Sequence, residues 1–171
     1  MIRKAYADTS GGQCHYRYQN GTGDPVVFLH QTPSSSQMFE AIMVRLQDHS
    51  TYAIDTPGFG QSFNPNHVPT MEEYSGWLME TIQSFSIDKL HLFGHHTGSS
   101  MAIQIVHDHP DLITSLTLIG PFIATFEEKE EMRKAISSDW GPVEDGSHLM
   151  TVWRLVGNDL GAKGNIELHH R

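Results

Sequence analysis

Short apolar runs and segments with helical spacing alternate along the first two thirds of the chain. The apolar runs are typical of strands buried on both faces, and they lie at residues 25–30, 51–54, 89–93 and 112–119. An earlier segment, residues 13–19, has the aromatic content of a strand and ends at the turn of residues 20–23. The pattern therefore predicts at least five strands.

Segments with helical periodicity separate these strands. Serines at 34–36 can cap a helix whose apolar residues, between 38 and 46, fall on one face. Thr70 and Glu73 form a T-x-x-E capping box before a second amphipathic segment, and a third helix follows Gly94 and is stopped by Pro110. This alternation predicts an α/β fold, in which a mostly parallel sheet is flanked by helices.

The alternation stops after Ile119. Residues 127–136 predict a charged helix, and apolar residues between 149 and 156 indicate another amphipathic turn, ended by Gly157. We therefore expect a core over residues 1–121, incomplete at its C-terminal side, and a helical cap or lid over residues 122–171. A sheet that ends at residues 112–119 leaves an apolar edge, which favours a homo-oligomer or a missing C-terminal portion.

Composition and charge narrow the classes of function. The chain has 171 residues, of which 38% are hydrophobic and 18% charged, as in a globular protein. The net charge of −9 argues against a nucleic-acid partner. The longest stretch without Asp, Glu, Lys, Arg or His, residues 112–126, is too short and too broken to span a membrane. With one cysteine and no apolar leader near its start, the chain is expected to be cytoplasmic.

The most informative segment is Gly94-His95-His96-Thr97-Gly98, which connects a predicted strand to a predicted helix. This is the context of a nucleophile elbow, G-x-S-x-G. The turn is so tight that side chains at the two glycine positions would clash with the strand and the helix. The central residue is then presented at the carboxyl edge of the sheet, where open α/β folds bind ligands.

Two further segments complete a family pattern. His30-Gln31-Thr32-Pro33 resembles an H-G-x-P loop, and residues 55–62 (DTPGFGQS) resemble a D-x-P-G-x-G-x-S turn. With the elbow, in this order, they resemble the α/β-hydrolase family over residues 12–121. The resemblance implies that His96 occupies the nucleophile position, and that the backbone N–H groups of Thr32 and Thr97 form an oxyanion hole.

The chain departs from that family pattern at three points. Gln31 replaces the glycine of H-G-x-P, His96 replaces the usual nucleophile, and the family's acid and general-base histidine fall beyond the last predicted strand. A neutral imidazole can still attack an acyl carbon, or act as a base for water. Three interpretations therefore stay open: hydrolysis of a small apolar ester or related acyl or activated-carbon substrate, a non-catalytic ligand-binding member, and the N-terminal part of a longer hydrolase.

Other residues are candidates for a substrate pocket. His30, Gln31 and His95 either contact a small-molecule substrate or make structural hydrogen bonds near the turns. Phe122 and Trp153 form an apolar wall in the cap, or belong to its core. No H-x-x-x-H or H-E-x-x-H spacing lies on the face of a predicted helix, where it would indicate a metal site. The proposed chemistry requires no cofactor.

Overall fold

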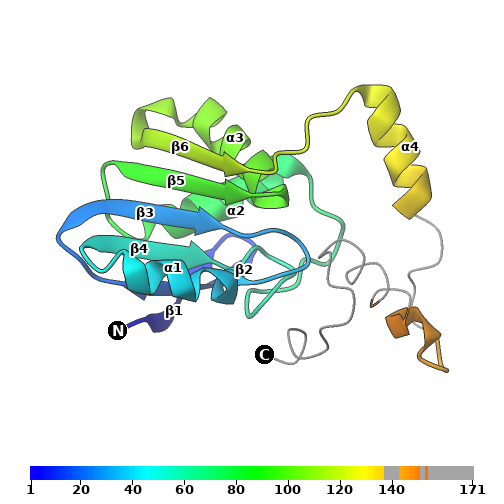
Figure 1. The fold of residues 1–171 in the computed structure, drawn as a ribbon, viewed down its shortest axis with the longest axis horizontal. Helices are drawn as coiled ribbons and strands as arrows, with labels where there is room; N and C mark the ends of the chain where they lie inside the picture. The colour runs from blue at the N-terminus through cyan, green and yellow to red at the C-terminus, as the bar shows by residue number, and fades with distance from the viewer. Residues whose placement is uncertain (137–142, 151–152, 154–171) are drawn as a thin grey trace. The chain divides into compact units, whose positions relative to one another are not determined.

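The computed structural model describes residues 1–136, 143–150 and 153 of the chain. Residues 1–122 form one compact unit and residues 123–171 a second. The first unit is built on a six-stranded sheet in the order β1-β2-β4-β3-β5-β6 (Figure 1). Its strands are β1 (Arg3–Thr9), β2 (Gly12–Gln19), β3 (Gly23–Leu29), β4 (His49–Ile54), β5 (Leu90–His95) and β6 (Ile113–Ile119).

The predicted α/β fold with a mostly parallel sheet is confirmed. Strand β3 pairs in parallel with β4 and β5, and β5 pairs in parallel with β6. Strands β1 and β2 form an antiparallel hairpin that joins the sheet beside β4. Because the parallel strands all end at one edge, the loops that follow β3, β4, β5 and β6 meet there.

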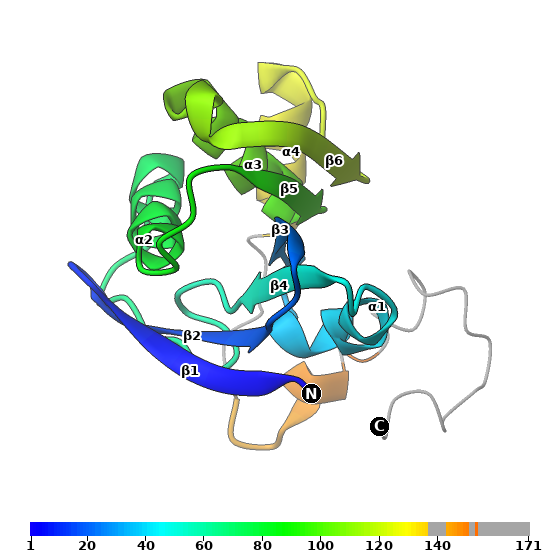
Figure 2. The same ribbon diagram turned by 90° about the vertical axis from the view of Figure 1, so that its left-hand side faces the viewer.

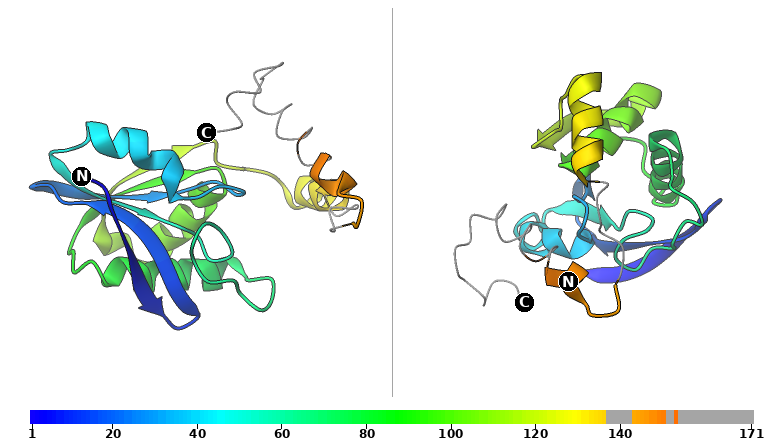
Figure 3. Two further views of the ribbon diagram at one scale, coloured as in Figure 1. Left: turned by 90° about the horizontal axis from the view of Figure 1, so that it is seen from below. Right: turned by 90° about the vertical axis from the view of Figure 1, so that its right-hand side faces the viewer.

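Helices cover both faces of the sheet (Figures 2 and 3). The helix α1 (Glu40–Arg45) and the preceding 3-10 turn η1 (Ser36–Phe39) lie on one face, where Phe39 and Met43 pack on Phe28 and Ala53. On the other face lie α2 (Met71–Gln83) and α3 (Thr97–Asp108), which bury the larger core. Another 3-10 turn, η2 (Pro110–Leu112), leads into β6.

The structure confirms some of the predicted helices and strands and differs from others. The capping box at Thr70 and Glu73 is present at the start of α2. The segment 38–46, expected as one helix, is instead divided into η1 and α1, and Met38 and Ile42 stay 39% and 38% exposed. The sequence pattern did not predict β1, because this edge strand buries only Ala7 and is otherwise polar or partly exposed.

The second unit contains the predicted charged helix, α4 (Phe126–Ile136), which begins with a capping box between Thr125 and Glu128. Leu149 and Trp153 are helical, whereas Val152, Val156 and Gly157, from the same predicted turn, lie outside the described residues. No strand follows Ile119 in the described part of the chain. None of the described helices is long and apolar enough to cross a bilayer.

Candidate active site

His96 lies at the apex of the turn between β5 and α3. Its φ of 50° and ψ of −114° fall in a sparsely populated region for a residue with a side chain. The residue is exposed at the edge of the sheet where the parallel strands end. The strained turn thus presents an imidazole where the elbow pattern predicts a reactive group.

The two glycines of the elbow are required by close backbone contacts. A Cβ on Gly94 would lie 2.7 Å from the carbonyl oxygen of Gly98, and a Cβ on Gly98 would lie 2.2 Å from the carbonyl oxygen of Leu29. Both distances are far below a van der Waals contact. The glycines therefore allow α3 to pack directly against β5 and the end of β3.

The end of β6 holds the other side of the His96 turn. The His96 N–H donates to the carbonyl oxygen of Ile119, with N and O 2.8 Å apart. Gly120 has a φ of +58°, and a Cβ placed on it would lie 3.1 Å from Nε2 of His96. The absence of a side chain at Gly120 thus leaves room for the imidazole. The sequence pattern predicts no role for Gly120, because its contact with His96 depends on the pairing of β6 beside β5.

The loop that follows β3 contacts the elbow through Thr32 and Thr97. The backbone N–H of Thr32 donates to Oγ1 of Thr97, and these atoms are 2.8 Å apart. The structure therefore brings together the two residues expected to form an oxyanion hole. It also shows that the Thr32 N–H already has an acceptor.

His30 makes two structural hydrogen bonds at the end of β3. The residue is fully buried; its Nε2 accepts from the Thr56 N–H at 2.9 Å, and its Nδ1 lies 2.7 Å from the carbonyl oxygen of Gln31. Since Nε2 accepts, Nδ1 carries the proton and the ring is neutral. Burial lowers the pKa of His30 below its ordinary value, which favours the same form. Of the two roles considered for His30, the geometry supports the structural one.

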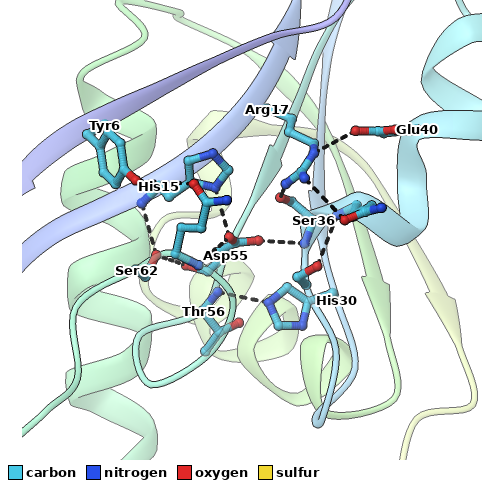
Figure 4. Close-up of polar contacts among 12 residues, drawn as sticks. Tyr6, His15, Arg17, His30, Ser36, Glu40, Asp55, Thr56 and Ser62 are labelled. Atoms are coloured by element: carbon cyan, nitrogen blue, oxygen red, sulfur yellow. Dashed lines mark hydrogen bonds and ion pairs between the residues drawn. The ribbon is translucent and has the colours of Figure 1, made fainter. Parts of the chain in front are cut away.

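Asp55 connects three segments behind this loop (Figure 4). Its Oδ1 accepts from the Ser36 N–H at 2.6 Å, and its Oδ2 accepts from the Gln61 N–H at 2.9 Å and lies 2.8 Å from Nδ1 of His15. Burial alone would raise the pKa of Asp55, but these hydrogen bonds outweigh it and hold the pKa below its ordinary value. A Cβ on Gly60 would overlap the Asp55 carboxylate, so the second glycine of the D-x-P-G-x-G-x-S pattern is required by the position of its aspartate.

Arg17 extends the same network to α1. Its Nη1 donates to Oγ of Ser36 at 2.7 Å, and its Nε donates to Oε1 of Glu40 at 2.7 Å. The guanidinium is almost completely buried. Ser36 is therefore held through its backbone N–H and its hydroxyl, which fixes the loop that carries Thr32.

The remaining predicted site residues differ in their placement. His95 is the last residue of β5, and its ring centroid lies 5.1 Å from that of His96. Burial, with a smaller contribution from His96, lowers the pKa of His95. Gln31 is partly exposed in the loop, and Phe122 is exposed after Gly120. Trp153 belongs to the second unit, so its predicted role in the pocket stays a prediction.

Among the residues that the structure describes, no group of three His, Cys, Asp or Glu side chains is arranged to hold a metal ion. An open cavity of about 340 Å³ lies at the opposite end of α3, and none of the elbow residues lines it. Its walls come from Met79, Gln83 and residues 108–112.

Known proteins resemble this chain in sequence and in fold. The model of the alpha/beta hydrolase fold family matches residues 24–141. A probable lysophospholipase, BODYGUARD 4 of Arabidopsis thaliana, is 25% identical over 90% of this chain and 41% of its own length. The haloalkane dehalogenase DatA of Agrobacterium tumefaciens C58 superposes with a TM-score of 0.65 at 25% identity, over 70% of this chain and 41% of that one.

A third comparison supports the fold alone. The epoxide hydrolase VrEH1 of Vigna radiata superposes with a TM-score of 0.71 at 20% identity, over 81% of this chain and 47% of that one. The chain spans less than half the length of each of these three proteins. The family model matches well over half of the chain, so the chain belongs to the alpha/beta hydrolase fold family.

Proposed function

We propose that the chain hydrolyses a small apolar ester, or a related acyl or activated-carbon substrate, with His96 at the nucleophile position. The observation that carries the proposal is the placement of His96, exposed at φ 50° and ψ −114° between β5 and α3, beside the Thr32–Thr97 contact. Related proteins include a probable lysophospholipase and a haloalkane dehalogenase. Membership of the family therefore leaves open which bond is cleaved.

His96 can act on an ester in two ways. In the first, a neutral ring nitrogen bonds to the acyl carbon, the carbonyl oxygen becomes an oxyanion, and collapse of the intermediate breaks the bond to the alkoxide. Water then attacks the acyl-imidazole; one of its protons goes to the alkoxide, and the acid is released. In the second, the imidazole takes a proton from water, the resulting hydroxide attacks the carbon, and the proton passes to the leaving alkoxide.

The second candidate function is non-catalytic ligand binding at the same elbow. It is favoured by one observation: within the described residues, no carboxylate is hydrogen-bonded to the His96 ring. The relatives are more than twice as long as the segment they share with this chain. An acid or base supplied by a longer polypeptide would therefore agree with a third proposal, that this chain is the N-terminal part of a larger hydrolase.

Hydrolysis of p-nitrophenyl butyrate by the full chain tests the leading proposal. The chain has 12 histidines, and exposed imidazoles hydrolyse activated esters slowly, so the control variant is His107→Ala, at the exposed far end of α3. We expect His96→Ala to lower the rate at least about 100-fold while His107→Ala does not. Equal rates for wild type and His96→Ala would exclude His96 as the reacting group.

The same preparation separates the two alternatives. Saturable binding of the butyrate ester without turnover would favour the binding function. An intact mass well above that of 171 residues in the natural protein would favour the larger hydrolase.

A further inference from the structure

The family pattern gives a role to the backbone N–H of Thr97 but none to its side-chain hydroxyl. The hydroxyl oxygen accepts the backbone N–H of Thr32 at 2.8 Å, and an N–H carries only one proton. The Thr32 amide therefore points at the Thr97 hydroxyl. A substrate oxygen could receive that amide proton only after Thr97 had moved away.

The hydroxyl keeps one proton of its own to donate. In the described part of the chain no hydrogen bond from Oγ1 of Thr97 is found, and the residue is exposed beside His96. A hydroxyl that accepts a hydrogen bond from an amide becomes a stronger donor, because the two bonds polarise each other. The Thr32–Thr97 contact thus orients and strengthens a donor at the apex of the elbow.

We infer that the side-chain hydroxyl of Thr97, oriented by the Thr32 N–H, donates a hydrogen bond to the substrate oxygen that becomes negatively charged. This inference rests on the proposed function. It replaces one of the two expected oxyanion donors, the backbone N–H of Thr32, by the hydroxyl of Thr97. The backbone N–H of Thr97, in the first turn of α3, has no partner within the helix and supplies the second donor. When His96 bonds to the acyl carbon, the π electron pair moves onto the carbonyl oxygen, and the hydroxyl proton stays on Oγ1.

The competing interpretation is that Thr97 blocks the site. In that case the hydroxyl must rotate away before the Thr32 N–H can bind the substrate oxygen. The two interpretations predict opposite effects of removing the hydroxyl. Thr97→Val keeps the shape of the side chain, whereas Thr97→Ser keeps the hydroxyl.

The test measures binding of butylphosphonate, a tetrahedral anion with a short alkyl chain, to the full chain by NMR of the backbone amides. We expect Thr97→Val to weaken binding about 10- to 100-fold, the usual effect of one hydrogen bond to a charged group. Thr97→Ser should restore binding to within about 3-fold of wild type. Thr114→Val, which removes an exposed hydroxyl on β6, is the matched control.

Each outcome decides between the interpretations. Unchanged or tighter binding by a folded Thr97→Val variant would overturn the inference, as would the absence of phosphonate binding to wild type. A Thr97→Ala variant, checked by circular dichroism, replaces Thr97→Val if the latter does not fold.

Hydrolysis of p-nitrophenyl butyrate separates this inference from the proposed function. Hydroxyl-dependent phosphonate binding without any turnover would confirm that the Thr97 hydroxyl binds an anion, but would remove the hydrolase proposal. Turnover that is equal or faster in Thr97→Val than in wild type would overturn the inference and leave the hydrolase proposal standing.

Discussion

Nδ1 of His15 and Oδ2 of Asp55 lie 2.8 Å apart, and both side chains are almost completely buried. A carboxylate only accepts hydrogen bonds, so the proton of this contact is on His15. Its other ring nitrogen, Nε2, is buried and has no hydrogen-bond partner among the described residues. The Asp55 carboxylate of the D-x-P-G-x-G-x-S motif therefore has a structural role. It lies at the end of β4, the strand that pairs with both β2 and β3.

Asp55→Asn tests this structural role. The substitution keeps one acceptor oxygen but leaves a buried donor of His15, Ser36 or Gln61 without its charged partner. We expect the free energy of unfolding to fall by about 3 kcal/mol, measured by urea denaturation. Asp8→Asn, in which an exposed side chain loses its charge but keeps an acceptor oxygen for Gln13, is the control and should change stability by less than about 0.5 kcal/mol.

Stability should fall as the pH is lowered. His30 has a folded pKa below its ordinary value of 6.5, so between these two values the unfolded chain binds more protons than the folded chain. Its contribution is present above pH 6.5 and is lost as the pH falls through the folded pKa. Asp55, whose pKa lies below its ordinary value of 3.8, adds a second loss under more acidic conditions.

Thermal melts between pH 7.5 and 4 measure this effect. The decline below pH 6.5 should be shallower in His30→Gln, which cannot titrate, than in wild type. His107→Gln, at an exposed position, should follow wild type. An identical pH dependence in His30→Gln would contradict the assignment of this loss to His30.

Strands that are buried on both faces could be predicted from the sequence, because each of them has a continuous run of apolar residues. Strands β3 and β5 lie between two layers of helices: Val27, Leu29 and Leu92 pack in the core on one face of the sheet, and Phe28 packs in the core on the other. Strand β1 was not predicted, since an edge strand with one buried residue resembles a polar loop. Within the site, the Thr32–Thr97 contact depends on a side-chain rotamer, and the Gly120–His96 contact depends on the pairing of β6 beside β5. Neither has a local sequence signal.

Gly98→Ala tests the close contact of the elbow with β3. A Cβ at this position would lie 2.2 Å from the carbonyl oxygen of Leu29, and neither the strand nor the helix can shift without losing core contacts. We expect a loss of about 3 kcal/mol or more, or failure to fold. Gly76→Ala on α2, where no atom lies within 4 Å of the new Cβ, should instead stabilise by up to about 1 kcal/mol.

Gly120→Ala tests whether space beside β6 sets the position of the imidazole. Its Cβ would lie 3.1 Å from Nε2 of His96, so we expect the ring to move and the rate of ester hydrolysis to fall about 10-fold or more. Gly58→Ala introduces a comparable backbone strain, at a φ of +87°, but its Cβ would approach nothing closer than 3.7 Å. A rate that is equally reduced in both variants would show that backbone strain, not contact with the ring, is responsible.

The backbone of His96 predicts a conflict between stability and activity. At φ 50° and ψ −114° a residue with a Cβ is strained by about 1–3 kcal/mol, and glycine relieves this strain at the cost of about 0.5–1 kcal/mol of chain entropy. His96→Gly should therefore be more stable than His96→Ala by about 1 kcal/mol, because alanine keeps the strained Cβ. Both variants lose the imidazole and should lose ester hydrolysis.

Thermal denaturation of the two His96 variants measures the difference. Ser86→Gly, at the other non-glycine position with positive φ among the described residues, serves as a reference for relief of strain away from the elbow. If His96→Ala is as stable as His96→Gly, the elbow stores no strain at this residue. If His96→Gly is also more stable than wild type, the chain retains a destabilising residue at the apex of its elbow, which is expected where a side chain is kept for its chemistry.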